Sequence, residues 1–227
     1  MKSNCFILIL LGATLAYGQQ WNFNKPDYQQ IGIHIADTHS HYYYPTLLER
    51  FKKSDTTLTL QEKRHLYYGY IFHPRYAPYE RSEYQDSLVQ VLRKERQGAE
   101  DLEKIIRYGD SVLVGNPFDL RTLNYQLYAL EQQRDTEGFE AKMIQSTAII
   151  DALMSSGDGT SKAFSFYVIN TSHEYGLLGI LGLDFGGSQS LTEHYDYLTV
   201  AANDFGIEGL YFDVTPCLNS LQKFLKK

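Results

Sequence analysis

The periodicity of the sequence changes at Gly157-Asp158-Gly159, and this change constrains the fold more than any other feature. Before it, apolar residues recur at spacings of three and four, which is typical of amphipathic helices. After it, residues 164–169 alternate between two sets of side chains, and further short aromatic runs follow between turn residues. The sequence therefore predicts an α+β fold, with a helical region over 19–156 and a β-β-β-β-α region over 157–227 packed on it.

The helical region is divided by start and stop signals. Thr59-Leu60-Gln61-Glu62 has the pattern of a capping box, and the helix that it opens should end before His73-Pro74, since the residue before a proline disfavours helical backbone. Asn116-Pro117-Phe118-Asp119 then separates two amphipathic segments, as in tetratricopeptide-like hairpins. No regular repeat follows, so we expect helical hairpins without a repeat array. Residues 31–35 alternate weakly and are expected to form a strand or an extended arm.

The region after Gly159 is expected to hold four strands and one helix. Glycines recur at 176, 179 and 182, and because glycine weakens a helix, the apolar run around them is interpreted as a strand. Asn203-Asp204-Phe205-Gly206 should join the last two strands, and Thr215-Pro216 starts the final helix. The expected strands cover residues 164–169, 175–183, 195–200 and 210–214. Together they predict a four-stranded, mostly antiparallel sheet with a C-terminal helix.

The first eighteen residues have the pattern of a secretory signal peptide. A lysine at the start precedes a short apolar run, and Ala16-Tyr17-Gly18 places small residues where a signal peptidase cleaves. The apolar run is shorter than the ~20 residues of a membrane span. Cys5 precedes the run, so there is no lipobox. We therefore expect a signal peptide over 1–18, a mature chain beginning at Gln19, and a secreted or periplasmic protein with no membrane span after cleavage.

Charge and composition exclude some classes of function. The net charge is −6, and mild acidity argues against a nucleic-acid partner, whose phosphates require a basic surface. The acids are unevenly placed, since residues 163–222 contain seven Asp or Glu and no Lys or Arg. Cys217 is the only cysteine after the expected signal, so an intramolecular disulfide is impossible. The glycine motifs lack the order and spacing of phosphate- and dinucleotide-binding loops, so no cofactor is expected.

The most aromatic stretch, Leu66–Tyr79, is the expected ligand-binding surface. Tyrosine combines an apolar ring with a polar end, which suits half-buried binding faces. Two prolines stiffen the second half of the stretch, and Arg75 adds a donor that binds carboxylates or stacks on rings. We expect Tyr68, Arg75, Tyr76 and Tyr79 to line a partly exposed patch that binds a protein, peptide or glycan. The alternative is a loop whose rings pack against its own helices.

Two polar groups favour a different function, that of a hydrolase. Asp37-Thr38-His39-Ser40-His41 resembles the metal-binding start of an amidohydrolase barrel, where two histidines on one strand share a metal; the alternative is a solvated polar turn. His173-Glu174 is a candidate acid–base pair, because a carboxylate raises the pKa of a neighbouring imidazole. The alternative for this pair is a set of hairpin residues bonded to backbone. Such a barrel needs about 250 residues and alternating strands and helices, which the helical first half does not provide.

Several segments together resemble a known family. They are LYYGYIFHPRYAPY at 66–79, the GDG motif at 157–159, SHEY at 172–175 and EGLYFDVT at 208–215. They are similar to an uncharacterised family of secreted proteins, a domain of unknown function found mostly in gut-dwelling Bacteroidetes, over residues 42–224. The resemblance implies secretion and one shared fold, and it carries no catalytic residues. We therefore expect an exported binding or scaffolding protein, because stacked helical hairpins form concave surfaces that tyrosines line well.

Overall fold

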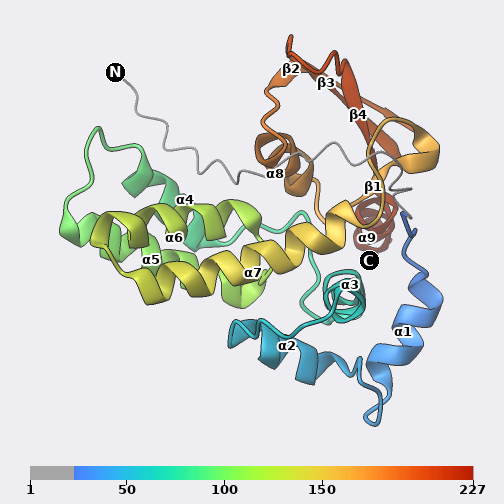
Figure 1. The fold of residues 1–227 in the computed structure, drawn as a ribbon, viewed down its shortest axis with the longest axis horizontal. Coiled ribbons are helices and arrows are strands. Elements are labelled where there is room, and N and C mark those ends of the chain that lie inside the picture. Colours follow the sequence, from blue (N-terminus) through green and yellow to red (C-terminus); the bar gives the residue numbers. More distant parts are fainter. Residues whose placement is uncertain (1–22, 227) are drawn as a thin grey trace, which may run out of the picture.

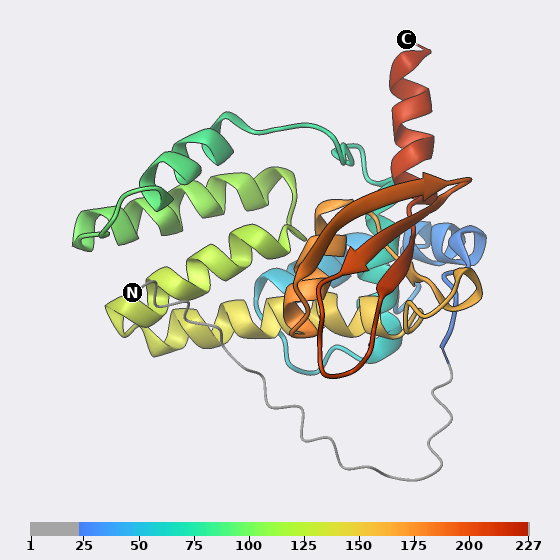
Figure 2. The ribbon, with the colours of Figure 1, turned by 90° about the horizontal axis from the view of Figure 1, so that it is seen from above.

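The computed structural model describes residues 23–226, so the expected signal peptide and its cleavage site lie outside the described residues. Within them the chain forms nine α-helices, two short 3-10 helices and one four-stranded sheet. The predicted α+β class is confirmed. Figures 1 and 2 show four helices within residues 83–154 at one end of the molecule and the sheet toward the other end, with α8 (Ser172–Ile180) between them.

The first part of the chain is helical, as expected. Its helices are α1 (Tyr28–Ala36), α2 (Tyr44–Lys52), α3 (Leu60–Gly69), α4 (Glu83–Leu92), α5 (Ala99–Gly115), α6 (Leu120–Gln133) and α7 (Thr136–Met154), with the 3-10 helix η1 (Tyr70–Phe72) after α3. Helices α4 to α7 pack in sequence order, each against the next, so they form the expected hairpins (Figure 1). The turn between α4 and α5 ends at Gly98, which is the N-cap of α5.

Side chains at the helix starts explain where the helices begin. The Thr59 hydroxyl accepts a hydrogen bond from the Glu62 amide, and the Glu62 carboxylate accepts one from the Thr59 amide at 2.8 Å, so the predicted capping box is confirmed. Asp119 caps α6 in a similar way, because its Oδ1 accepts from the Thr122 amide at 3.0 Å. These caps fix the positions of the turns that precede α3 and α6.

The sheet contains the strands in the order β1-β4-β3-β2, with β1 (Phe166–Tyr167), β2 (Phe185–Thr192), β3 (Tyr195–Val200) and β4 (Gly209–Asp213). Strand β1 pairs with β4 in parallel, and the other two pairings are antiparallel. The predicted hairpin between the last two strands is confirmed by the register of Tyr197 opposite Tyr211. The C-terminal helix α9 (Thr215–Leu225) follows directly after β4.

Two of the predicted strands are helices. Residues 31–35 lie in α1, where Ile31 and Ile35 are buried one helical turn apart and Ile33 is exposed. The run 175–183 lies mostly in α8 (Ser172–Ile180), which buries Leu177 and Leu178. In both cases the packing of one apolar face against the core outweighs a local pattern or propensity. The strand β2 was not expected, because its polar and glycine-rich sequence lacks a strand pattern.

The first predicted strand is shorter than expected. Only Phe166–Tyr167 pairs with β4, and the residues before it form the 3-10 helix η2 (Lys162–Phe164). The turn at Gly157-Asp158-Gly159 behaves as the sequence indicates, since Gly159 has φ +74°. Gly157 is also constrained, because a Cβ there would overlap the Phe164 carbonyl oxygen. Glycine is therefore needed at both positions, for a left-handed backbone at one and for close approach at the other.

The main hydrophobic core is shared by the two regions of the chain. It joins residues of α1, α2, α3 and α7 to residues of α8 and the sheet, for example Tyr67, Phe118, Ile149, Phe166 and Phe212. A second, smaller cluster lies among α4, α5 and α6. Within residues 23–226, no helix combines the length and hydrophobicity that a bilayer span requires.

Candidate functional site

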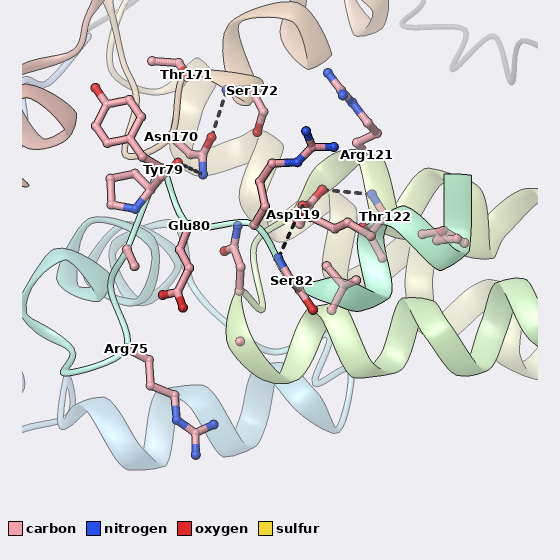
Figure 3. Close-up of a pocket in the computed structure, with 18 of the residues that line it drawn as sticks. Arg75, Tyr79, Glu80, Ser82, Asp119, Arg121, Thr122, Asn170, Thr171 and Ser172 are labelled. Carbon is pink, nitrogen blue, oxygen red and sulfur yellow. Dashed lines mark hydrogen bonds between the residues drawn. The ribbon is translucent and has the colours of Figure 1, made fainter. Parts of the chain in front are cut away.

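An open polar cleft of about 870 Å³ lies where the two regions meet. One wall is the segment 74–82 between η1 and α4. The opposite wall consists of the first turn of α6 and the turn 170–172 that leads into α8, as Figure 3 shows. Three turns from distant parts of the sequence therefore build the cleft.

The segment 74–82 is held in place by bonds to the chain that precedes α8. The Tyr76 hydroxyl donates to the Ile169 carbonyl at 2.8 Å, and the Asn170 side-chain amide donates to the Pro78 carbonyl at 3.3 Å. Asn170 also accepts from the Ser172 amide at 2.9 Å, so one side chain orders both walls (Figure 3). Prolines at 74 and 78 restrict the backbone further.

The α6 wall is organised by Asp119, which is buried at the base of the cleft. Its Oδ1 accepts from the Thr122 amide, and its Oδ2 accepts from the Gln85 side-chain amide at 3.4 Å. Gln85 also accepts from the Ser82 amide at 3.2 Å, which completes the capping box of α4. The carboxylate of Asp119 is thus committed to helix capping and to joining α4 to α6.

Two arginines stand at opposite ends of the cleft. The Arg75 guanidinium donates to the Val114 carbonyl at 3.2 Å and is otherwise exposed. Arg121 is exposed and has no hydrogen bond or ion pair among the described residues. Figure 3 shows the two side chains pointing away from each other, with Asp119 between them. A third cleft arginine, Arg81, forms an exposed ion pair with Asp86 at 3.2 Å. Arg121 is therefore the cleft arginine with an uncommitted charge.

A second cavity of about 330 Å³ adjoins the cleft between α6, α7 and α8. Arg121 and Ser172 line both cavities, so the two adjoin at these residues. The walls of the second cavity are mainly apolar and include Leu127, Met143 and Ile150. We call it the apolar groove.

Glycines on α8 keep the apolar groove open. Gly176 and Gly179 both line it, and a Cβ added at Gly179 would meet nothing within 4 Å. At Gly176 the nearest atoms would belong to Leu120 at 3.9 Å, an ordinary contact. Neither glycine has a positive φ, so the backbone does not require it. Each glycine weakens α8 by about 1 kcal/mol relative to alanine. What the two glycines do provide is space, because the groove is wider where it is lined by residues without a Cβ.

The four residues of the expected aromatic patch are divided by the structure. Arg75 and Tyr79 line the polar cleft, and Tyr79 is 47 % exposed. Tyr76 turns inward, where it packs edge-on against Tyr70, and burial raises the pKa of its phenol. Tyr68 does not belong to the patch, because it is 0 % exposed.

The burial of Tyr68 has a clear structural reason. The helix α3 packs against α1 and α2 on one side and against α7 on the other, so consecutive residues on it both face protein. The Tyr68 hydroxyl donates to the Ala152 carbonyl at 3.1 Å, and its ring meets Tyr28 edge-on. The sequence argument assumed that α3 has a single buried face, and this assumption was wrong.

The Asp37-x-His39-x-His41 sequence lies in a turn between α1 and α2 and not on a strand. Asp37 Oδ1 accepts from the His39 amide at 2.9 Å, and both histidines are exposed. This is the hydrogen bond of an Asx turn. In residues 23–226, no group of three or more His, Cys, Asp or Glu is arranged to hold a metal ion. His39 and His41 therefore do not lie on one face of a strand, which is the arrangement expected to let two histidines share a metal ion.

His173 and Glu174 lie in the first turn of α8, not at a hairpin. Both side chains are buried, and neither lines the polar cleft or the apolar groove. His173 Nε2 donates to the Phe118 carbonyl at 2.8 Å, so Nδ1 is unprotonated and accepts from the Tyr67 hydroxyl at 2.6 Å. Burial lowers the pKa of this imidazole to about 4. His173 therefore joins α3, the α6 turn and α8 as a neutral ring, with both nitrogens occupied.

Glu174 points away from His173 toward the sheet. Its neighbour there is Asp196 of β3, which is also buried. Burial, together with a smaller contribution from the charge of Asp196, raises the pKa of Glu174 to about 9. The two residues of the candidate acid–base pair thus have separate partners and no common opening, which does not support the hydrolase alternative.

A family model described as Domain of unknown function (DUF4919) matches residues 29–223. The chain is a DUF4919 protein. The match extends from α1 into α9 and includes both walls of the polar cleft, which confirms that the sequence resemblance was to a domain of unknown function. No curated protein and no solved structure shows significant similarity to the chain.

Sequence reasoning missed half of the polar cleft of this DUF4919 protein. Asp119 and Arg121 were read only as part of a helical connection, and 170–172 only as a turn. A weak signal was present, since Asn116-Pro117-Phe118-Asp119 and Asn170-Thr171-Ser172 are both polar turns that precede helices. Nothing in the sequence shows that the two turns lie together.

Proposed function

We propose that this DUF4919 protein is an exported binding protein whose polar cleft and apolar groove together hold an extended acidic peptide. The observation that carries the proposal is the position of Arg121, an uncommitted guanidinium at the junction of the two cavities. An arginine with no partner is available for bidentate binding of a carboxylate. Arg75 offers a second guanidinium at the far end of the cleft (Figure 3).

A peptide fits the two cavities better than a glycan does. The apolar groove is lined by aliphatic side chains and methionine, which accept an apolar side chain of a ligand. The polar cleft offers backbone and hydroxyl groups at 170–172 beside the ring of Tyr79. A chain with a carboxylate near Arg121 and an apolar residue next to it would use both cavities at once.

Export is supported by the pattern of the first eighteen residues, which is typical of a cleaved signal peptide. We infer that the protein acts in the periplasm or at the cell surface. Peptides and partner proteins are both available there. The mild negative charge of the chain argues against nucleic acid as the ligand.

The test is a display selection of random linear peptides against the purified protein, followed by titration of the enriched peptides. We expect enrichment of sequences that combine Asp or Glu with an adjacent large apolar residue. Arg121→Gln should weaken binding at least tenfold, because a charge-assisted hydrogen bond is lost. Arg96→Gln is the matched control, since Arg96 is an exposed arginine in the α4–α5 turn and lines neither cavity. Enrichment without acidic residues, or equal loss in both variants, would contradict the proposal.

A further inference from the structure

Helix α9 leaves the body of the protein after its first turn. Pro216 and Cys217 are buried, whereas residues 221–226 are all exposed. Figure 2 shows the helix projecting away from the sheet and from the other helices. Its outer half carries two large apolar side chains, Phe224 at 76 % exposure and Leu225 at 73 %. The outer half of this helix therefore has no packing partner within the described chain.

A helix of this length does not persist without packing. Isolated helices shorter than about 12–15 residues are marginal in water, and α9 has 11 residues. Leu218, Leu221 and Leu225 recur at spacings of three and four, which places them in one stripe along the helix. Leu218 packs against the core of its own chain, so the part of the stripe that a partner would cover is Leu221 and Leu225.

The sheet offers a matching surface on its outer face. Along β3 and β4 the side chains alternate between buried residues and half-exposed ones, and Tyr197 and Tyr211 lie opposite each other in the half-exposed set. Their ring centroids are 4.6 Å apart. A Cβ at Gly209 would overlap the Tyr197 ring, so glycine there allows the ring to lie flat across β4. The outer face therefore carries two adjacent tyrosine rings, tilted by 45° to each other.

The outer half of α9 and one end of the sheet also carry opposite charges. Lys223 and Lys226 of α9 are exposed and have no ion pair among the described residues, and the sequence 215–227 contains no acid. The end of the sheet at the β3–β4 loop carries exposed acids at Asp204 and Glu208. Asp184 lies at the same end, because its carbonyl accepts from the amide of Ala201 at 2.9 Å. This end is free of basic residues, as is the whole of 163–222.

Within one chain, α9 and the acidic end of the sheet lie at opposite ends of the strands. Helix α9 starts where β4 ends, whereas the acidic end lies where β4 begins. The exposed half of α9, residues 221–226, spans about 9 Å at a rise of 1.5 Å per residue, and the five residues of β4 span about 17 Å at 3.4 Å per residue, so the exposed half fits within the length of the strand. In this structure α9 points away from its own sheet (Figure 2), so the outer face is left for an antiparallel copy.

We propose that the partner of α9 is a second copy of this chain. Two copies pack antiparallel about a twofold axis, and α9 of each lies along the outer sheet face of the other. The stripe of α9 covers the partner's Tyr197 and Tyr211, and Lys223 and Lys226 reach the partner's Asp204 and Glu208. Because each copy gives and receives the same contact, the assembly closes as a dimer and does not extend into a fibre.

The first test is the oligomeric state of the purified protein, measured by sedimentation velocity over a concentration series. We expect a dimer whose dissociation constant rises at least tenfold when Phe224 and Leu225 are both replaced by Asp. Ile33→Asp is the control, since Ile33 is an exposed apolar residue on α1 and should leave the dimer unchanged. A monomer at every concentration would overturn the proposal. Association of that monomer with phosphatidylglycerol vesicles would instead assign α9 to a membrane surface.

The second test exchanges the charges and does not depend on apolar burial. Lys223→Glu with Lys226→Glu makes α9 acidic, and Asp204→Lys with Glu208→Lys makes the sheet end basic. Each double variant alone should be monomeric, because like charges then face each other. Mixed in equal amounts, the two should form a heterodimer, in which both contacts again join opposite charges. Circular dichroism confirms that each variant is folded. Failure of folded variants to associate on mixing would refute the arrangement.

Discussion

Replacing Glu174 by Gln should make the protein more stable at neutral pH, although it changes a side chain that is buried in the folded protein. Glu174 is 0 % exposed, and neither of its carboxyl oxygens receives a hydrogen bond within the described chain. Its neighbour Asp196 accepts from the Gln189 side-chain amide at 2.5 Å through Oδ2, whereas Oδ1 has no donor. A protonated Glu174 supplies that donor. Folding therefore favours the protonated form of Glu174.

The size of the effect follows from the pKa. The folded pKa of Glu174 is about 9, compared with 4.5 for an ordinary glutamate. Because the folded state holds its proton more tightly, this group's contribution is fully favourable below pH 4.5 and is lost as pH rises toward 9. At 1.36 kcal/mol per pH unit, the loss between pH 4.5 and pH 7 is roughly 3 kcal/mol. Burial raises the pKa of Asp196 as well, and this acts in the same direction.

Glutamine keeps the shape and the hydrogen-bond donor but cannot ionise. We expect the gain from Glu174→Gln to be near zero at pH 4.5 and to grow toward roughly 3 kcal/mol at pH 7. The assay is urea unfolding of both proteins at several pH values. Glu140→Gln, an exposed glutamate on α7, is the matched control and should show no such trend. A wild-type stability that is constant or rises between pH 5 and pH 8 would refute the reasoning, as would an equal loss from Glu174→Gln at every pH.

Three further predictions concern the fold and its processing. Gly159→Ala should lower the free energy of unfolding by at least about 1 kcal/mol, because φ is +74° and a Cβ would lie 2.7 Å from a core phenylalanine ring. Gly179→Ala should instead raise the free energy of unfolding in the same urea assay, because Gly179 lies on a helix and a Cβ there meets nothing within 4 Å. Tyr67→Phe should cost about 1–3 kcal/mol of stability, since it removes a donor from the buried His173 nitrogen; an unchanged unfolding midpoint would contradict that hydrogen bond. The mature protein should begin at Gln19 or within two residues of it, and an intact mass of the full 26.1 kDa chain in the cell envelope would exclude cleavage.

The sequence was informative wherever a local rule determines the structure. The Thr59 capping box, the β3–β4 hairpin and the left-handed turn at Gly159 each depend on a few neighbouring residues, and all three are present. Residues 175–183 were misread because the burial of Leu177 and Leu178 depends on distant partners that propensity does not include.

The candidate site was predicted only in part for the same reason. Arg75 and Tyr79 were found because the aromatic stretch is conspicuous in the sequence. Arg121 was not found, since its importance comes from a turn some fifty residues later that closes the other side of its cavity. Tyr68 was assigned to the surface because a sequence cannot show that α3 is covered from two sides.

The strand order has a consequence for the way in which the chain acquires its structure. The strand β4 lies between β1 and β3, although it is the last strand to be synthesised. Until Gly209–Asp213 is available, Phe166–Tyr167 has no strand to pair with, and one edge of β3 has no hydrogen-bonded neighbour. The shared core therefore cannot close before nearly the whole chain is available, so its formation depends on contacts between residues that are far apart in the sequence.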